Sequence, residues 1–141
     1  MLMLKVAQEI ILAALEEAER RKLKPLAVVV LDSRGSVKAS ASQDGTSLLR
    51  EKVAHGKAFG ALGLGLGSRA IFNRAQEQPY FVSAVNAIAG GSLVPVPGGV
   101  LIKSDDGETL GAVGISGDAS DNDEACAVTA IKAVSLQPDA G

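Results

Sequence analysis

The sequence predicts a single α+β domain in which helices cover both faces of an antiparallel sheet. The expected elements follow one another as helix, hairpin, helices, hairpin and helix. A hairpin pairs its strands antiparallel, and two helical layers suffice to cover both faces of one sheet. The 141 residues are the usual size of one domain, and no repeat, low-complexity segment or linker divides them.

Residues 4–22 are expected to form the first helix, because their apolar residues recur on one face. These residues are Leu4, Ala7, Ile10, Ile11, Ala14, Leu15 and Ala18. Pro25 prevents the helix from continuing. The β-branched run 26–32 predicts a strand that is buried on both faces, and the alternating segment 37–43 is its expected hairpin partner.

A second helix is expected over residues 48–64, where the run LLREKVAHGKAFGALGL is rich in alanine and glycine. Each glycine inside a helix costs about 1 kcal/mol, so the smooth surface needs a reason. Two explanations stay open: close approach of another backbone as the helix packs on the sheet, or contact with a flat ligand. Helices over 68–77 and 79–89 should follow, the latter starting at Pro79 and ending before Gly90.

The second hairpin is expected from strands over 95–104 and 108–117. The turn between them, Asp105-Asp106-Gly107, is the strongest hairpin signal in the chain. A final helix should run from Glu124 to about Leu136, and the tail 137–141 is expected to fray.

Composition narrows the class of protein. The formal net charge is −2 with both signs interspersed, so no basic field exists to attract nucleic acid. A single cysteine cannot form an internal disulfide, which is typical of a reducing compartment. No membrane-length apolar run or convincing signal peptide is present. We therefore expect a cytoplasmic protein without nucleic-acid or membrane partners.

The stretch VGISGDASDNDEACA at 113–127 is the most acidic in the chain. Its four carboxylates are Asp118, Asp121, Asp123 and Glu124. They miss the spacing of a calcium loop, and zinc would find only Cys126 nearby, so no metal site is expected. Asp121 followed by Glu124 has the spacing of a capping box, with Ser120 as the alternative cap. A ligand or subunit contact stays open, and Cys126 is expected to be a small core residue.

His55 is the only histidine and the candidate acid/base or ligand-binding residue. The cations Arg50 and Lys57 are close along the same helix, where they could meet a carboxylate. A lone histidine is often simply a surface or satisfied core residue, so both interpretations stay open.

The segment PVPGGVLI places Pro97, Gly98 and Gly99 at a strand entry. Glycines there permit a bulge or the close approach of a ligand to the backbone. These three residues complete the candidate cofactor-binding set with His55 and the two cations.

The order of "VVVLDSRG", "VAHGKAFGALGLG", "PVPGGVLI", "GETLGAVGISGD" and "DNDEACA" resembles the GlcG/HbpS family, also called the haem-binding or PduO C-terminal-like domain. The resemblance covers about residues 5–136. It implies a profilin-like α/β/α sandwich with a central five-stranded antiparallel sheet. It also implies a homo-oligomer with an even number of subunits, favouring an octamer. Some members bind haem, one group is fused to corrinoid adenosyltransferases, and others are encoded beside glycolate or diol catabolism genes.

The leading hypothesis is a small-molecule binding protein, with haem or a corrinoid as ligand between the His55–Lys57 helix and the 97–99 strand entry, at a subunit interface. The alternative is an enzyme acting on a small hydroxy- or oxo-acid, with His55 as acid/base and the amides of Gly98 and Gly99 as oxyanion donors. An accessory protein without a ligand of its own is the third. The sequence leaves the ligand and any catalysis open.

Overall fold

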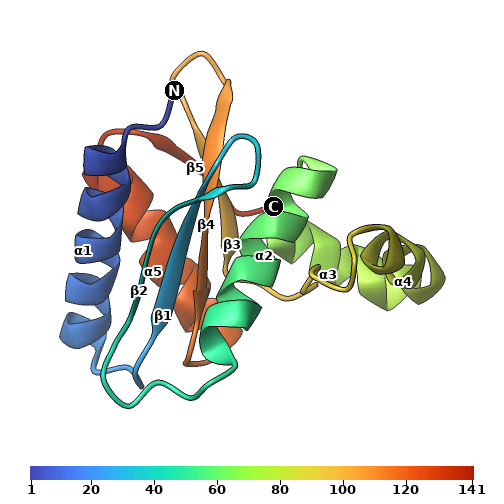
Figure 1. Ribbon diagram of the computed structural model, residues 1–141, viewed down its shortest axis with the longest axis horizontal. Coiled ribbons are helices and arrows are strands. Elements are labelled where there is room, and N and C mark those ends of the chain that lie inside the picture. The colour runs from blue at the N-terminus through green and yellow to red at the C-terminus, as the bar shows by residue number, and fades with distance from the viewer.

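The computed structural model describes all residues 1–141 and consists of five helices and one five-stranded antiparallel sheet, with helices on both faces (Figure 1). The elements are α1 (Leu4–Arg21), β1 (Ala27–Asp32), β2 (Val37–Ser42), α2 (Arg50–Leu64), α3 (Ser68–Glu77), α4 (Pro79–Ile88), β3 (Gly99–Lys103), β4 (Thr109–Ser116), α5 (Ser120–Ala133) and β5 (Gln137–Asp139). The predicted α+β class and the five-stranded sheet are confirmed.

The strands lie in the order β2-β1-β4-β3-β5. Both predicted hairpins form, β1 with β2 and β3 with β4, and the two hairpins join through the antiparallel pair β1–β4. The central strands are therefore those with the most continuous apolar runs, because a strand paired on both edges and covered on both faces has no contact with water.

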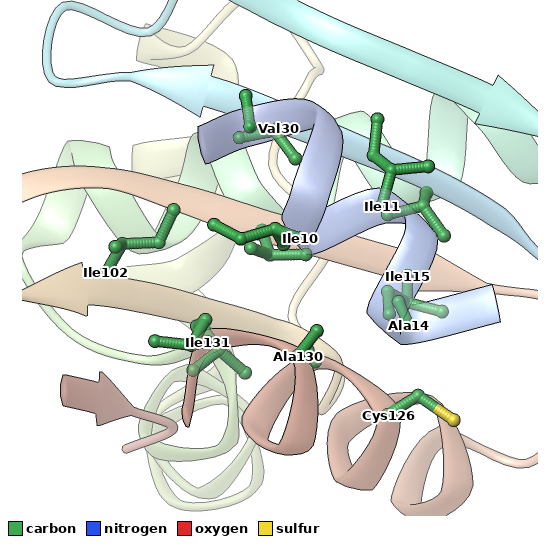
Figure 2. Packing of buried hydrophobic residues seen from close by; sticks show 14 of the residues in the cluster. Ile10, Ile11, Ala14, Val30, Ile102, Ile115, Cys126, Ala130 and Ile131 are labelled. Atoms are coloured by element: carbon green, nitrogen blue, oxygen red, sulfur yellow. The ribbon is translucent and has the colours of Figure 1, made fainter. Parts of the chain in front are cut away.

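One face of the sheet is covered by α1 and α5 (Figure 1). Figure 2 shows how the branched side chains of this layer pack: Ile10 of α1 lies between Val30 of the sheet and Ile131 of α5, and Ile11 lies at the edge of the same cluster. Cys126 belongs to the same cluster and is fully buried, as expected of a small core residue. None of the helices is long and apolar enough to cross a membrane.

The opposite face is covered by α2 and is built from smaller residues. Ala54, Ala58 and Ala61 of α2 pack against the sheet. A Cβ atom at Gly114 of β4 would overlap the backbone carbonyl of Ala54, so the helix backbone lies directly on this strand. Close packing of α2 on the sheet thus depends on a residue without a side chain.

The glycines of α2 itself face a different neighbour. A Cβ atom at Gly56 would lie 2.6 Å from Val94 Cγ2, and one at Gly60 would lie 2.9 Å from Leu93 Cγ. The amide of Val94 donates to the carbonyl of Gly56 at 3.2 Å. Close approach of the segment 92–94 therefore explains these glycines, through the Ser92 carbonyl and Val94 side chain at Gly56 and the Leu93 side chain at Gly60.

The tail was predicted to fray, and this prediction is wrong. Residues Gln137–Asp139 form β5, which pairs with β3, and Lys103 of β3 makes a 3.0 Å ion pair with Asp139. The physical reason is that β3 would otherwise present unpaired amides and carbonyls at the edge of the sheet.

The last helix also starts and ends earlier than predicted, at Ser120 and Ala133.

The close approach of α2 to β4 leads to the first prediction. Replacing Gly114→Ala should lower the free energy of unfolding by about 1–3 kcal/mol, because the added methyl group overlaps helix backbone that cannot give way locally. Gly63→Ala is the matched control: it lies in α2 with open space around it, and the change should raise stability by up to about 1 kcal/mol. Urea denaturation measures both, and equal stability of the two variants would contradict the account of α2 packing.

Candidate functional site

The side chain of His55 lies at the wall of a pocket of about 480 Å³. The pocket is formed by the first turns of α2, by β1 and β2, and by the segment that follows α4. Its lining residues are Val29, Val37, Ser40, Leu49, Glu51, Lys52, Val53, His55, Gly91, Ser92 and Val94. Its volume falls within the range of small-molecule sites.

The imidazole of His55 is half-buried and stacks on Phe59, one turn further along α2, with ring centroids 5.6 Å apart and planes at 18°. This contact fixes one face of the ring. Five of the eleven lining residues are apolar, and the side chains of Glu51 and Lys52 supply one charge of each sign at the rim. The pocket thus combines apolar walls with one imidazole, one cation and one carboxylate.

Lys57 lies two residues beyond His55 on the same helix, about half a turn away, and does not line the pocket. It is 2% exposed, and its Nζ atom donates to the carbonyl of Ile115 at 2.8 Å and to Asp123 Oδ2 at 3.2 Å. The pair joins α2 on one face of the sheet to α5 on the other. The ammonium group is therefore held inside the protein and is not free to meet a ligand.

This ion pair is buried and closely surrounded by backbone. Gly98 has a φ of +122°, and a Cβ atom there would lie 2.9 Å from Lys57 Nζ, so the lysine passes over bare backbone. Burial lowers the pKa of Lys57 and raises the pKa of Asp123, while the charge of each partner opposes the shift of the other. Asp123 Oδ1 also accepts the backbone amide of Asp118 at 3.1 Å.

Arg50 lies at the first residue of α2 and points away from the His55 pocket. Its Nη1 atom donates to Ser116 Oγ at 3.2 Å, and its side chain lines a second, polar pocket of about 230 Å³ together with Lys24 and the loop 45–47. The two pockets share no lining residue, so Arg50 and His55 belong to separate sites.

Pro97, Gly98 and Gly99 are buried at the start of β3 and line neither pocket. The amide of Gly99 donates to Ser68 Oγ at 2.7 Å, and a Cβ atom at Gly99 would overlap the carbonyl of Lys57. These glycines therefore allow α2 and α3 to approach the strand. The Gly99 amide is not free to serve as the oxyanion donor that the enzyme hypothesis requires.

The acidic stretch does not cap α5 as predicted. The N-cap is Ala119, without a side-chain hydrogen bond, and Asp118 accepts the amide of Ala119 at 2.8 Å. Asp121 and Glu124 instead bind the guanidinium of Arg69 at the start of α3. The capping box fails because the helix begins at Ser120, which places Asp121 inside its first turn.

No group of three or more His, Cys, Asp or Glu side chains is placed to hold a metal ion. The thiol of Cys126 is buried, and burial raises its pKa to about 11, so it carries no thiolate near neutral pH.

Sequence reasoning missed Asp123 as the partner of Lys57, because the two are far apart in the chain. A signal did exist: Lys57 stands in an otherwise alanine- and glycine-rich helix segment, where a cation needs a buried partner.

Comparison with known proteins agrees with this architecture. The family model described as "Haem degrading protein HbpS-like" matches residues 2–132.

The solved haem complex of PduOC superimposes with a TM-score of 0.85 at 24% identity, covering 96% of this chain and 96% of that chain. Klebsiella pneumoniae ORFY gives a TM-score of 0.85 at 21% identity, covering 95% and 90%. A double mutant of Streptomyces reticuli HbpS gives 0.81 at 24% identity, covering 94% and 86%. These structures show a shared fold. No curated protein sequence matches the chain.

The buried ion pair leads to a prediction of strong coupling. Lys57→Met should lower the free energy of unfolding by about 3–5 kcal/mol, because it leaves the Asp123 carboxylate buried without its partner. Adding Asp123→Asn should recover much of that loss, since the amide retains an acceptor for Asp118 but carries no charge. Lys52→Met, on the same helix but exposed, should change stability by less than about 0.5 kcal/mol. Urea denaturation of the wild type, of the single variants Lys57→Met, Asp123→Asn and Lys52→Met, and of the double variant measures the coupling. Strictly additive effects of Lys57→Met and Asp123→Asn would rule the coupling out.

Proposed function

The chain belongs to the HbpS-like family, and we propose on this premise that it binds a small planar ligand, with haem as the leading candidate, in the pocket beside His55. The resemblance to the GlcG/HbpS family is thereby confirmed. A relative of the same fold, PduOC, was solved as a haem complex. The observation that carries the proposal is the position of the chain's only imidazole at the wall of an apolar pocket.

The residues of the pocket fit the chemistry of haem. A histidine imidazole is a common axial ligand of haem iron, and a lysine at the rim suits a propionate. Val29, Val53 and Val94 offer the apolar contacts that a porphyrin face needs. Bound haem would supply iron-centred redox or ligand-binding chemistry. The chain itself would hold the ring through His55 and anchor its acidic edge through Lys52.

Titration of the purified protein with haem tests this proposal. The wild type should shift the Soret band, and His55→Ala should weaken binding at least about tenfold, because a metal ligand is lost. Gln76→Ala on α3 is the control, since it is exposed and helical and lies outside the pocket. An unshifted wild-type spectrum would contradict haem binding. A shifted band that is identical in His55→Ala would contradict ligation by this residue.

We also infer that the chain assembles as an even-numbered homo-oligomer, with the octamer favoured by the family resemblance. The feature that supports self-association is α4, whose sequence PYFVSAVNAI contains no charge. It projects with α3 from the side of the domain (Figure 1), and Val82 is its one fully buried residue, while Tyr80 and Ile88 are 70% and 87% exposed. Beside it, a groove of about 190 Å³ is lined by six apolar residues of α2, α4 and Leu93. A second copy of the chain would cover this surface.

Native mass spectrometry tests the assembly. The wild type should appear as an even-numbered oligomer, and Ile88→Lys should shift the population toward smaller species, because it places a charge in the apolar surface. Leu12→Lys is the matched control: this leucine is also exposed but lies on α1, beyond the sheet from α4. A wild-type spectrum containing the monomer alone would refute the assembly, and equal loss in both variants would refute the role of α4.

A further inference from the structure

The second pocket, at the N-terminal end of α2, differs in character from the His55 pocket. It encloses about 230 Å³ and has no apolar side chain among its lining residues, apart from a proline. The lining consists of Lys24, Pro25, Gly45, Thr46, Ser47, Arg50 and Gly117. Two cations and two hydroxyl groups thus face one small cavity, together with backbone from two loops.

Arg50 is the central group of this pocket, and its charge has no partner. The side chain is half-buried, yet none of the ion pairs in the protein includes it. One of the five N–H groups of the guanidinium donates to Ser116 Oγ, and the others make no hydrogen bond within the chain. A half-buried guanidinium with one hydrogen bond and no ion pair has its charge and its remaining N–H donors available for a ligand.

The charged side chains around Arg50 leave an excess of positive charge at this pocket. Arg50 lies close enough to Lys57 for its charge to help lower the pKa of that lysine, after the larger effect of burial. The Asp123 carboxylate is paired with Lys57 and forms no ion pair with Arg50. The Lys24 side chain likewise forms no ion pair.

The carboxylates near this pocket are engaged elsewhere. Asp118 accepts hydrogen bonds from the Asn122 side chain and from the amides of Lys24 and Ala119, and these bonds, with the Lys24 charge, hold its pKa below the ordinary value. Asp44 lies beside Gly45 in the chain but lines the adjoining groove along α1, which shares Pro25 with this pocket. Neither carboxylate reaches the guanidinium of Arg50.

We propose that this pocket binds an oxyanion, the carboxylate of a small acid or a phosphate group, through the guanidinium of Arg50 with Lys24 as the second cation. Planar guanidinium groups bind both kinds of anion through paired charge-assisted hydrogen bonds. Ser47 adds a hydroxyl donor, whereas the single hydroxyl proton of Thr46 is donated to the carbonyl of Gln43 at 2.6 Å. The site is separate from the His55 pocket, and the inference does not depend on haem binding.

Calorimetric titration with inorganic phosphate and, separately, with malonate tests the proposal at constant ionic strength. The wild type should bind at least one of the two anions, and the one it prefers identifies the source of the oxyanion. Arg50→Gln should weaken that binding at least about tenfold, because it removes charge-assisted hydrogen bonds. Lys24→Gln, at the exposed edge, should weaken it roughly two- to fivefold. Arg34→Gln is the control, since Arg34 is an exposed arginine outside the pocket and should bind as the wild type does.

Two results would overturn the proposal: no binding of either anion to the wild type, or equal affinity in Arg50→Gln. Circular dichroism checks that Arg50→Gln is folded. If this variant does not fold, Lys24→Gln decides, and an affinity unchanged from the wild type then counts against the site. Haem titration of the same variants separates the two proposals, because Arg50→Gln should leave the Soret shift intact even where anion binding is lost.

Discussion

The ion pair between Lys57 and Asp123 is the interaction on which the rest of the structure depends. It connects the two helical layers across the sheet, because α2 and α5 lie on opposite faces and meet at no other charged contact. Two buried charges are expensive to remove from water, so the pair needs further hydrogen bonds to both charged groups. Here the carbonyl of Ile115 gives the ammonium a second acceptor, and the amide of Asp118 gives the carboxylate a second donor. The position of α2, and with it both pockets, follows from this contact.

The pair also explains the distribution of glycine. Gly98 leaves room for the lysine side chain, while Gly99 and Gly114 let the helix backbone lie on the strands. Without these three residues α2 would stand further from the sheet, and Lys57 would not reach Asp123. The two faces of the sheet are consequently different: interlocked isoleucine and valine toward α1 and α5, and alanine on bare backbone toward α2.

Much of the fold could be predicted because its signals are local. The apolar stripe of the first helix, the prolines and glycines around residues 68–91, and the turn at Asp105–Gly107 each act within a few residues, and the corresponding elements form. The polar tail QPDAG carries no such signal, and its strand exists because β3 needs a partner. The candidate site was harder to predict, because its contacts join residues that are far apart in the chain. Arg50, His55 and Lys57 are close along one helix and were therefore expected at one site. Side chains at different positions of a helix point in different directions. His55 lines one pocket, Arg50 lines another, and Lys57 lies in the interior.

The close contact between α2 and its surroundings has a consequence for how this architecture can diversify. The helix wall of the His55 pocket is closely packed against its neighbours at Gly56 and Gly114, where there is no room for a Cβ atom, so it has little freedom to shift for a ligand of another shape. The opposite wall is formed by Val37 and Ser40 of an exposed edge strand, whose side chains are unconstrained by such packing. Evolution toward new ligands would therefore act on that edge while conserving the helix, leaving one fixed surface on which many specificities can be built.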